Sequence, residues 1–210
     1  MSEINFVELQ QQIIEATRTA FTELKAARNE DFYSFVLYTR YSPTVIIPTA
    51  NSEQAYAQFC KINSSKYSRS QLDFDFRWSP FDWEYQCHGV EHFFPLNDML
   101  EENFDLDDPN CESLQAELYA TMISALSVLN SERLFGEGTD REEITVFCSV
   151  LDSMDADWLE MKSSEILNPS STHTKFSDIL LKLKGPGPSF SLEEYDKVYS
   201  AFLKHFPSTK

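Results

Sequence analysis

The fold is decided by the stretch FYSFVLYTRY at residues 32–41. It is rich in aromatic and β-branched residues, which favour strands. Period-two alternation divides its apolar side chains into two sets, with Phe32, Val36 and Tyr38 on one face and Tyr33, Phe35 and Leu37 on the other. A strand that is apolar on both faces is typical of a sheet covered on both sides. The stretch therefore predicts a central strand between two layers of helices.

Helical periodicity flanks this strand on both sides in the chain. Apolar residues recur at steps of three and four, and we expect helices over 3–28, 51–63, 96–104, 114–130, 155–167 and 191–205. The last of these begins with a capping box, Ser191 and Glu194. Ser79-Pro80 is a good helix start, which predicts a short helix over 81–86.

Further strands are expected at 45–47, where Pro48 ends the strand, at 73–78, where aromatic and charged residues alternate, and at 144–151. The order of elements predicts an α+β fold. We expect a single α+β domain over residues 1–210, with a central mixed or antiparallel sheet covered by helices.

Negative charge is the strongest compositional signal, and it is uneven. The chain carries a net charge of -17, and residues 98–160 hold 17 acidic side chains against two basic ones. Such a field opposes nucleic acid and anionic membranes and favours a basic protein partner, although plain solubility is the simpler explanation of the acidity. The predicted partner-binding residues are Glu101, Glu102, Asp105, Asp107, Asp108, Glu137, Asp140 and Glu142.

Localisation and redox state follow from the termini and the cysteines. The N-terminus lacks a basic segment followed by an apolar run, and no stretch reaches the roughly 20 apolar residues of a membrane span, so we expect a cytoplasmic protein. The four cysteines form no Cys-x-x-Cys pair, which predicts reduced, mostly buried thiols. No cofactor is expected, and the oligomeric state stays open.

One motif suggests metal chemistry. Residues 88–92 read His-Gly-Val-Glu-His, the H-x-x-E-H pattern of inverted zinc peptidases. In that alternative interpretation His88 and His92 bind zinc from one helix face and Glu91 is the general base. Gly89 and Pro95 both weaken a continuous helix, so a strand or turn with surface histidines is the simpler interpretation. The acids available as a third ligand are Glu143, Glu160 and Glu165.

Three weaker patterns carry less. Asp105, Asp107 and Asp108 suggest calcium, but the loop lacks the glycine of an EF-hand. Gly136-x-Gly138 lacks a third glycine and precedes a strand, so it indicates a turn rather than a nucleotide site. The aromatic region 74–85 could bind a small ligand, although core packing explains it more simply.

Several stretches together resemble a known family. They are Arg77-Trp78-Ser79-Pro80 with Asp82-Trp83, Phe135-Gly136-Glu137-Gly138 with Arg141-Glu142, the strand that ends in Asp152, and Leu167-Asn168-Pro169 before Phe176. They are similar to a bacterial family classed as a domain of unknown function and seen among polymorphic-toxin immunity-type proteins. The resemblance implies a non-enzymatic protein that binds and neutralises a toxin. The functional residues of that family are unknown, so none is carried over to this chain. The uneven charge and the resemblance together give the main hypothesis, an immunity-type protein that occludes a basic partner.

Overall fold

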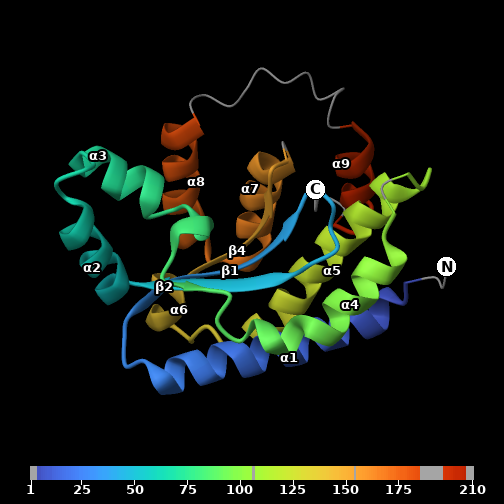
Figure 1. The fold of residues 1–210 in the computed structure, drawn as a ribbon, viewed down its shortest axis with the longest axis horizontal. Coiled ribbons are helices and arrows are strands. Elements are labelled where there is room, and N and C mark those ends of the chain that lie inside the picture. Colours follow the sequence, from blue (N-terminus) through green and yellow to red (C-terminus); the bar gives the residue numbers. More distant parts are fainter. Residues whose placement is uncertain (1–3, 106, 154, 185–195, 207–210) are drawn as a thin grey trace.

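The computed structural model describes residues 4–105, 107–153, 155–184 and 196–206. Its centre is a four-stranded sheet in the order β3-β2-β1-β4. The strands are β1 (Phe32–Arg40), β2 (Ile47–Ser52), β3 (Tyr85–Gln86) and β4 (Thr145–Leu151). β1 runs antiparallel to β2 and parallel to β4, and helices lie on both faces of the sheet (Figure 1). The predicted α+β fold with a covered mixed sheet is confirmed.

β1 is the central strand, as its sequence predicts, but two of its side chains are exchanged between the faces. All residues from Phe32 to Thr39 are buried. The register with β2 shifts between Phe32 and Ser34, so Phe32 packs in the same cluster as Phe35, whereas Tyr33 packs with Val36. The predicted faces of Phe32 and Tyr33 were therefore wrong, because a bulge adds one residue and breaks the strict alternation.

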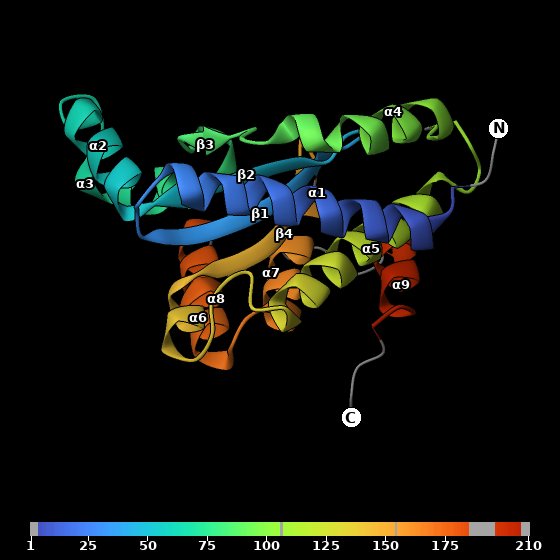
Figure 2. The same ribbon diagram turned by 90° about the horizontal axis from the view of Figure 1, so that it is seen from below.

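One face of the sheet carries the larger core. The helices α1 (Phe6–Ala27), α4 (Phe94–Asn103) and α5 (Cys111–Ser131) gather on this side (Figure 2). Asn5 caps α1 by accepting a hydrogen bond from the Glu8 amide at 3.3 Å. Phe21 of α1 is fully buried, and its ring lies 4.9 Å from that of Phe35 and 5.5 Å from that of Phe135. The predicted helices over 3–28, 96–104 and 114–130 are thus confirmed.

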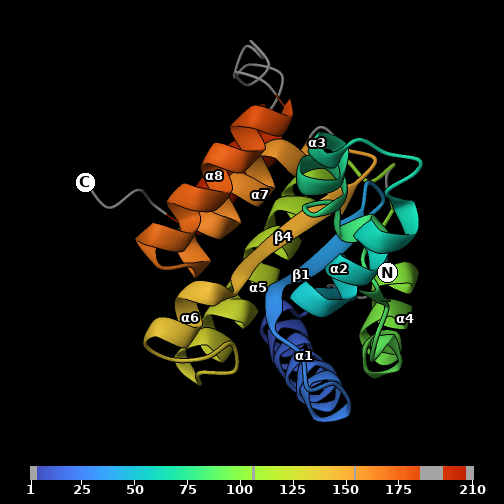
Figure 3. The ribbon, with the colours of Figure 1, turned by 90° about the vertical axis from the view of Figure 1, so that its left-hand side faces the viewer.

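The opposite face is covered by segments far apart in the sequence. They are α2 (Glu53–Asn63), the region of residues 69–83 and α8 (Ser170–Lys184), while α7 (Asp155–Leu167) lies along the edge strand β4 (Figure 3). The predicted helix over 51–63 is confirmed, and Ser52 caps it by accepting a hydrogen bond from the Ala55 amide at 3.0 Å. The helix over 155–167 is confirmed too. The last helix, α9 (Asp196–Leu203), packs against α5, whereas its predicted capping box lies outside the described residues.

The predicted strand over 73–78 is wrong. The chain instead forms α3 (Arg69–Gln71), which continues into one turn of π-helix at Leu72–Phe76. Ser68 starts this helix with a capping box to Gln71. Phe76 packs its ring against Phe59, 5.2 Å away, rather than on the sheet. A short alternating run is compatible with a helix as well as with a strand, and here the capping box of Ser68 favours the helix.

Four other elements differ from expectation. β2 runs through Pro48 rather than ending there. Pro48 has no N–H to donate, but it is only the second residue of β2, and β3 pairs with Thr49 and Ala50 instead. The expected helix over 81–86 is one 3₁₀ turn, Pro80–Asp82, followed by β3. The short helix α6 (Thr139–Glu143) and the long helix α8 were not predicted.

Candidate functional site

The eight predicted partner-binding acids fall into two groups. The first, the α4–α5 acidic group, lies in the last turn of α4 and in the loop after it and contains Glu101, Glu102, Asp105, Asp107 and Asp108. The second, the α6 acidic group, lies in and just before α6 and contains Glu137, Asp140 and Glu142. All eight side chains are exposed except Asp108, which is half-buried. The residues that were predicted together therefore reach solvent, but from two places.

The two groups lie at opposite ends of α5 (Figure 2). This helix has 21 residues, and at 1.5 Å per residue it separates its ends by about 30 Å. Moreover, not every acid of residues 98–160 is on the surface, because Glu160 is buried and accepts a hydrogen bond from the Ser149 hydroxyl at 2.6 Å. The eight predicted acids thus form two separate surfaces rather than one patch, and Glu160 of the same segment lies in the interior.

The two groups differ in their internal contacts. Between described residues, one ion pair involves these eight acids, Arg133 with Glu137 at 2.5 Å in the α6 acidic group. In the α4–α5 acidic group, Asp105 and Asp108 accept backbone amide hydrogen bonds from Asp107 at 2.9 Å and Asn110 at 2.7 Å. These bonds build turns, which is the ordinary role of aspartate in loops and gives no support to a calcium site.

Asp155, at the start of α7, is an acid whose environment favours the neutral form. Burial raises its pKa above the ordinary 3.8, although the Trp158 indole donates a hydrogen bond to it at 3.0 Å. Since the folded pKa lies above the unfolded one, the contribution of Asp155 to stability is fully present below the unfolded pKa and is lost as pH rises through the folded pKa. We therefore compare the free energies of unfolding of wild type and Asp155→Asn. The wild-type value minus the variant value should fall as pH is raised from about 4.

Urea unfolding of both proteins at a series of pH values measures this difference. Asp140→Asn, which removes an exposed carboxyl, is the matched control for the change in net charge. The prediction would be contradicted if the stability difference between wild type and D155N stayed constant with pH. It would also be contradicted if that difference changed with pH in the same way as the difference between wild type and D140N.

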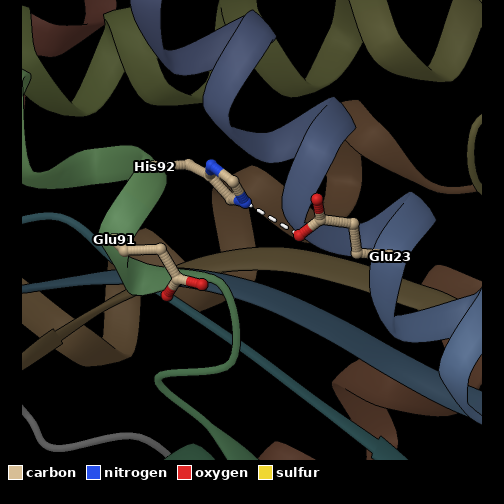
Figure 4. Close-up of side chains that lie close together, drawn as sticks. All are labelled: Glu23, Glu91 and His92. Atoms are coloured by element: carbon tan, nitrogen blue, oxygen red, sulfur yellow. Dashed lines mark hydrogen bonds and ion pairs between the residues drawn. The ribbon is translucent and has the colours of Figure 1, made fainter.

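Residues 88–92 do not form the helix that the H-x-x-E-H interpretation requires. His88 lies in a turn, Gly89 has a left-handed backbone (φ 74°), and a 3₁₀ turn covers Val90–Phe93. The two histidines therefore do not share one helix face. His92 instead points toward Glu23 of α1, with its Nε2 atom 2.8 Å from the Glu23 carboxylate (Figure 4).

Glu23, Glu91 and His92 form a cluster that sequence reasoning missed. One ligand atom from each lies within 4.8 Å of the others, and the Glu91 carboxylate lies beside the His92–Glu23 pair (Figure 4). Glu23 is 68 residues before Glu91 in the chain and reads as an ordinary solvent-facing acid of an amphipathic helix. No local sequence signal could have joined it to the other two.

Gly89 allows this close approach between α1 and residues 88–92. A Cβ atom built on Gly89 would lie 2.5 Å from the Cβ of Ala20, one helical turn before Glu23. Its positive φ is also a conformation that favours glycine. The cluster therefore depends on a tight backbone contact and not on flexible side chains alone.

The aromatic region 74–85 is a packed part of the core. Trp83 is buried, and the Tyr33 ring lies edge-on to it with 6.0 Å between ring centroids. Arg77 stacks over Tyr33 at 4.2 Å and forms an ion pair with Glu53. Burial raises the pKa of Tyr33, in keeping with a structural role. These contacts favour core packing over the small-ligand interpretation.

A second cluster joins α5, α6 and α7 around Arg141. Arg141 is only 8% exposed and donates hydrogen bonds to the Asn130 side chain, the Ile144 carbonyl and the Leu167 carbonyl, each at 2.6 Å. It also donates to the side chain of Asn168 at 3.1 Å. Burial lowers the pKa of Arg141 to about 10. Two of the stretches that carry the family resemblance, around Arg141 and around Leu167-Asn168, therefore meet in space.

Comparison with known proteins identifies a family for most of the chain. Residues 13–169 match the model of a family described as Domain of unknown function (DUF4303). The chain belongs to the DUF4303 family. The DUF4303 match begins inside α1 and ends after α7, so it includes the sheet, both acidic groups and the Glu23–Glu91–His92 cluster.

Other comparisons add no relative. Neither a search of curated proteins nor a search of solved structures found a match to this DUF4303 protein. In the described part of the chain, no helix has both the length and the apolarity needed to cross a membrane. Of the four cysteines, which are all free thiols, Cys148 is buried, Cys60 and Cys111 are half-buried and Cys87 is exposed, so the prediction that most are buried was wrong.

Proposed function

We propose that this DUF4303 protein is a non-enzymatic, immunity-type binding protein of the bacterial cytoplasm that occludes a basic protein partner. The single observation that carries the proposal is the α4–α5 acidic group. It places five carboxylates within eight residues, and no ion pair with another described residue neutralises them. A surface of this charge accelerates the encounter with a basic partner and repels nucleic acid.

The placement of Glu101 and Glu102 supports a role beyond solubility. Both lie in the last turn of α4, where the described helix carries no basic residue. Carboxylates at a helix C-terminus interact unfavourably with the helix dipole, at a cost of a few tenths of a kcal/mol each. A need for solubility alone could be met at positions that carry no such cost.

The distance between the two acidic groups favours one of them as the contact surface. A standard interface covers about 800 Å² per partner, which corresponds to a disc roughly 32 Å across. A footprint centred on one end of α5 would leave most of the other end uncovered. We assign the contact to the α4–α5 acidic group, because the α6 acidic group has fewer carboxylates and one of them is paired with Arg133.

Capture from a lysate of the source organism tests this assignment. The test variant carries E101Q, E102Q, D105N, D107N and D108N, and the matched control carries E137Q, D140N and E142Q. We expect wild type and the control to retain a basic protein at low salt and to release it at high salt. We expect the test variant to lose it, with association slowed by about tenfold or more.

An activity assay completes the test. The purified partner must lose its own activity when the DUF4303 protein is added, because an immunity-type protein acts by blocking the active surface of its partner. Retention of no basic protein at low salt, or equal retention by both variants, would contradict the proposal.

A further inference from the structure

We propose that Glu23, Glu91 and His92 bind one divalent transition-metal ion, for which Zn²⁺ is the best fit. The proposal is independent of the partner-binding function, because the cluster lies on α1 and the 3₁₀ turn rather than on either acidic group. It also differs from the H-x-x-E-H interpretation, since Glu23 takes the place that the motif gives to His88.

The charges of the cluster call for a cation. Two carboxylates face one imidazole, and the imidazole carries at most one positive charge, so it cannot neutralise both. The His92 Nε2 atom lies 2.8 Å from the Glu23 carboxylate, so one hydrogen bond joins the two groups. A divalent ion in place of the bridging hydrogen would neutralise both carboxylates at once.

The distances fit coordination after a small adjustment. Zinc bonds of about 2.0–2.2 Å to nitrogen and oxygen place the donor atoms of a tetrahedral site roughly 3.3–3.6 Å apart. Here the three ligand atoms lie within 4.8 Å of one another, and the His92 Nε2 atom is 2.8 Å from the Glu23 carboxylate. The side chains of Glu23 and His92 are 55% and 29% exposed, so both are free to make the required adjustment of up to about 1.2 Å.

The donor set points to the class of metal. One imidazole with two carboxylates suits zinc and its neighbours, whereas magnesium and calcium prefer oxygen ligands alone. Three protein ligands leave the fourth tetrahedral position to water. The backbone contact of Gly89 with Ala20 holds the segments together before any ion binds, so the site is largely formed in advance.

Calorimetric titration of the full chain, first stripped with a chelator, tests the proposal with ZnCl₂ and MgCl₂. We expect one Zn²⁺ per chain and much weaker binding of Mg²⁺. Glu23→Gln and His92→Gln should each weaken Zn²⁺ binding by at least about tenfold. His88→Gln is the matched control, because it removes a neighbouring histidine of the same motif and should bind Zn²⁺ as wild type does. Circular dichroism confirms that each variant is folded.

Three results would overturn the site. They are the absence of saturable Zn²⁺ binding, wild-type affinity in E23Q, and loss of binding in H88Q. The variant with five neutralised acids in the α4–α5 acidic group separates this site from adventitious binding there. It should bind Zn²⁺ normally, and loss of the ion would place it on the acidic surface instead.

Discussion

Arg141→Met is expected to lower the free energy of unfolding by about 3 kcal/mol. The substitution keeps an apolar stem but removes every donor that Arg141 offers. The Leu167 carbonyl keeps a hydrogen bond from Asn130, and the Asn168 side chain keeps one from the Val146 amide. The Ile144 carbonyl and the Asn130 side-chain oxygen lose the bonds that Arg141 donates to them. Because both bonds are part-buried, each acceptor left without a donor costs about 1–2 kcal/mol.

Urea unfolding followed by fluorescence measures this loss. Arg133→Met is the matched control, because the Arg133 side chain is 71% exposed and its ion pair with Glu137 is a surface pair. Such pairs contribute up to about 1 kcal/mol. Equal effects of R141M and R133M would show that Arg141 does not hold α5, α6 and α7 together.

Phe21→Ala is expected to cost about 4 kcal/mol of unfolding free energy. Phe21 is fully buried, and its ring contacts those of Phe32, Phe35 and Phe135. Truncation to alanine loses the transfer free energy of the ring and leaves a cavity between α1 and the sheet, and such substitutions cost about 3–5 kcal/mol. Thermal and urea unfolding measure the effect.

Phe94→Ala provides the same chemical change at the surface. The Phe94 side chain, in the first turn of α4, is 54% exposed. Its truncation should cost well under half as much as that of Phe21, because little apolar area is removed from the core. A loss for F94A comparable with that for F21A would contradict this account of the core.

Strong periodicity made most of the fold predictable. The central strand β1 follows from its aromatic and β-branched composition, and the helices α1, α2 and α5 follow from apolar spacing. The exchange of Phe32 and Tyr33 between faces could not be predicted, since a bulge depends on the pairing partner and not on the strand's own alternation. Residues 73–78 misled for a related reason, because their alternation is too short to distinguish a strand from a helix.

The candidate sites were predictable to different degrees. The exposure of the acidic residues follows from their chemistry, whereas their division into two surfaces depends on the length and direction of α5. The partnership of Glu23 with His92 is a contact between segments 69 residues apart, so it had no sequence signal. Local patterns report helices and turns, but contacts between distant segments depend on the whole fold.

The parallel pairing of β1 with β4 has a consequence for biosynthesis. Ser34 pairs with Thr145, so the hydrogen-bonding edge of the central strand waits for a segment made 111 residues later. The antiparallel hairpin with β2 can form early, but loop closure over such a separation is slow. Until β4 emerges from the ribosome, β1 presents a row of unpaired backbone donors and acceptors flanked by aromatic and aliphatic side chains, the kind of surface on which nascent chains associate. Production of this protein at high level should therefore depend on chaperones that shield that edge during synthesis.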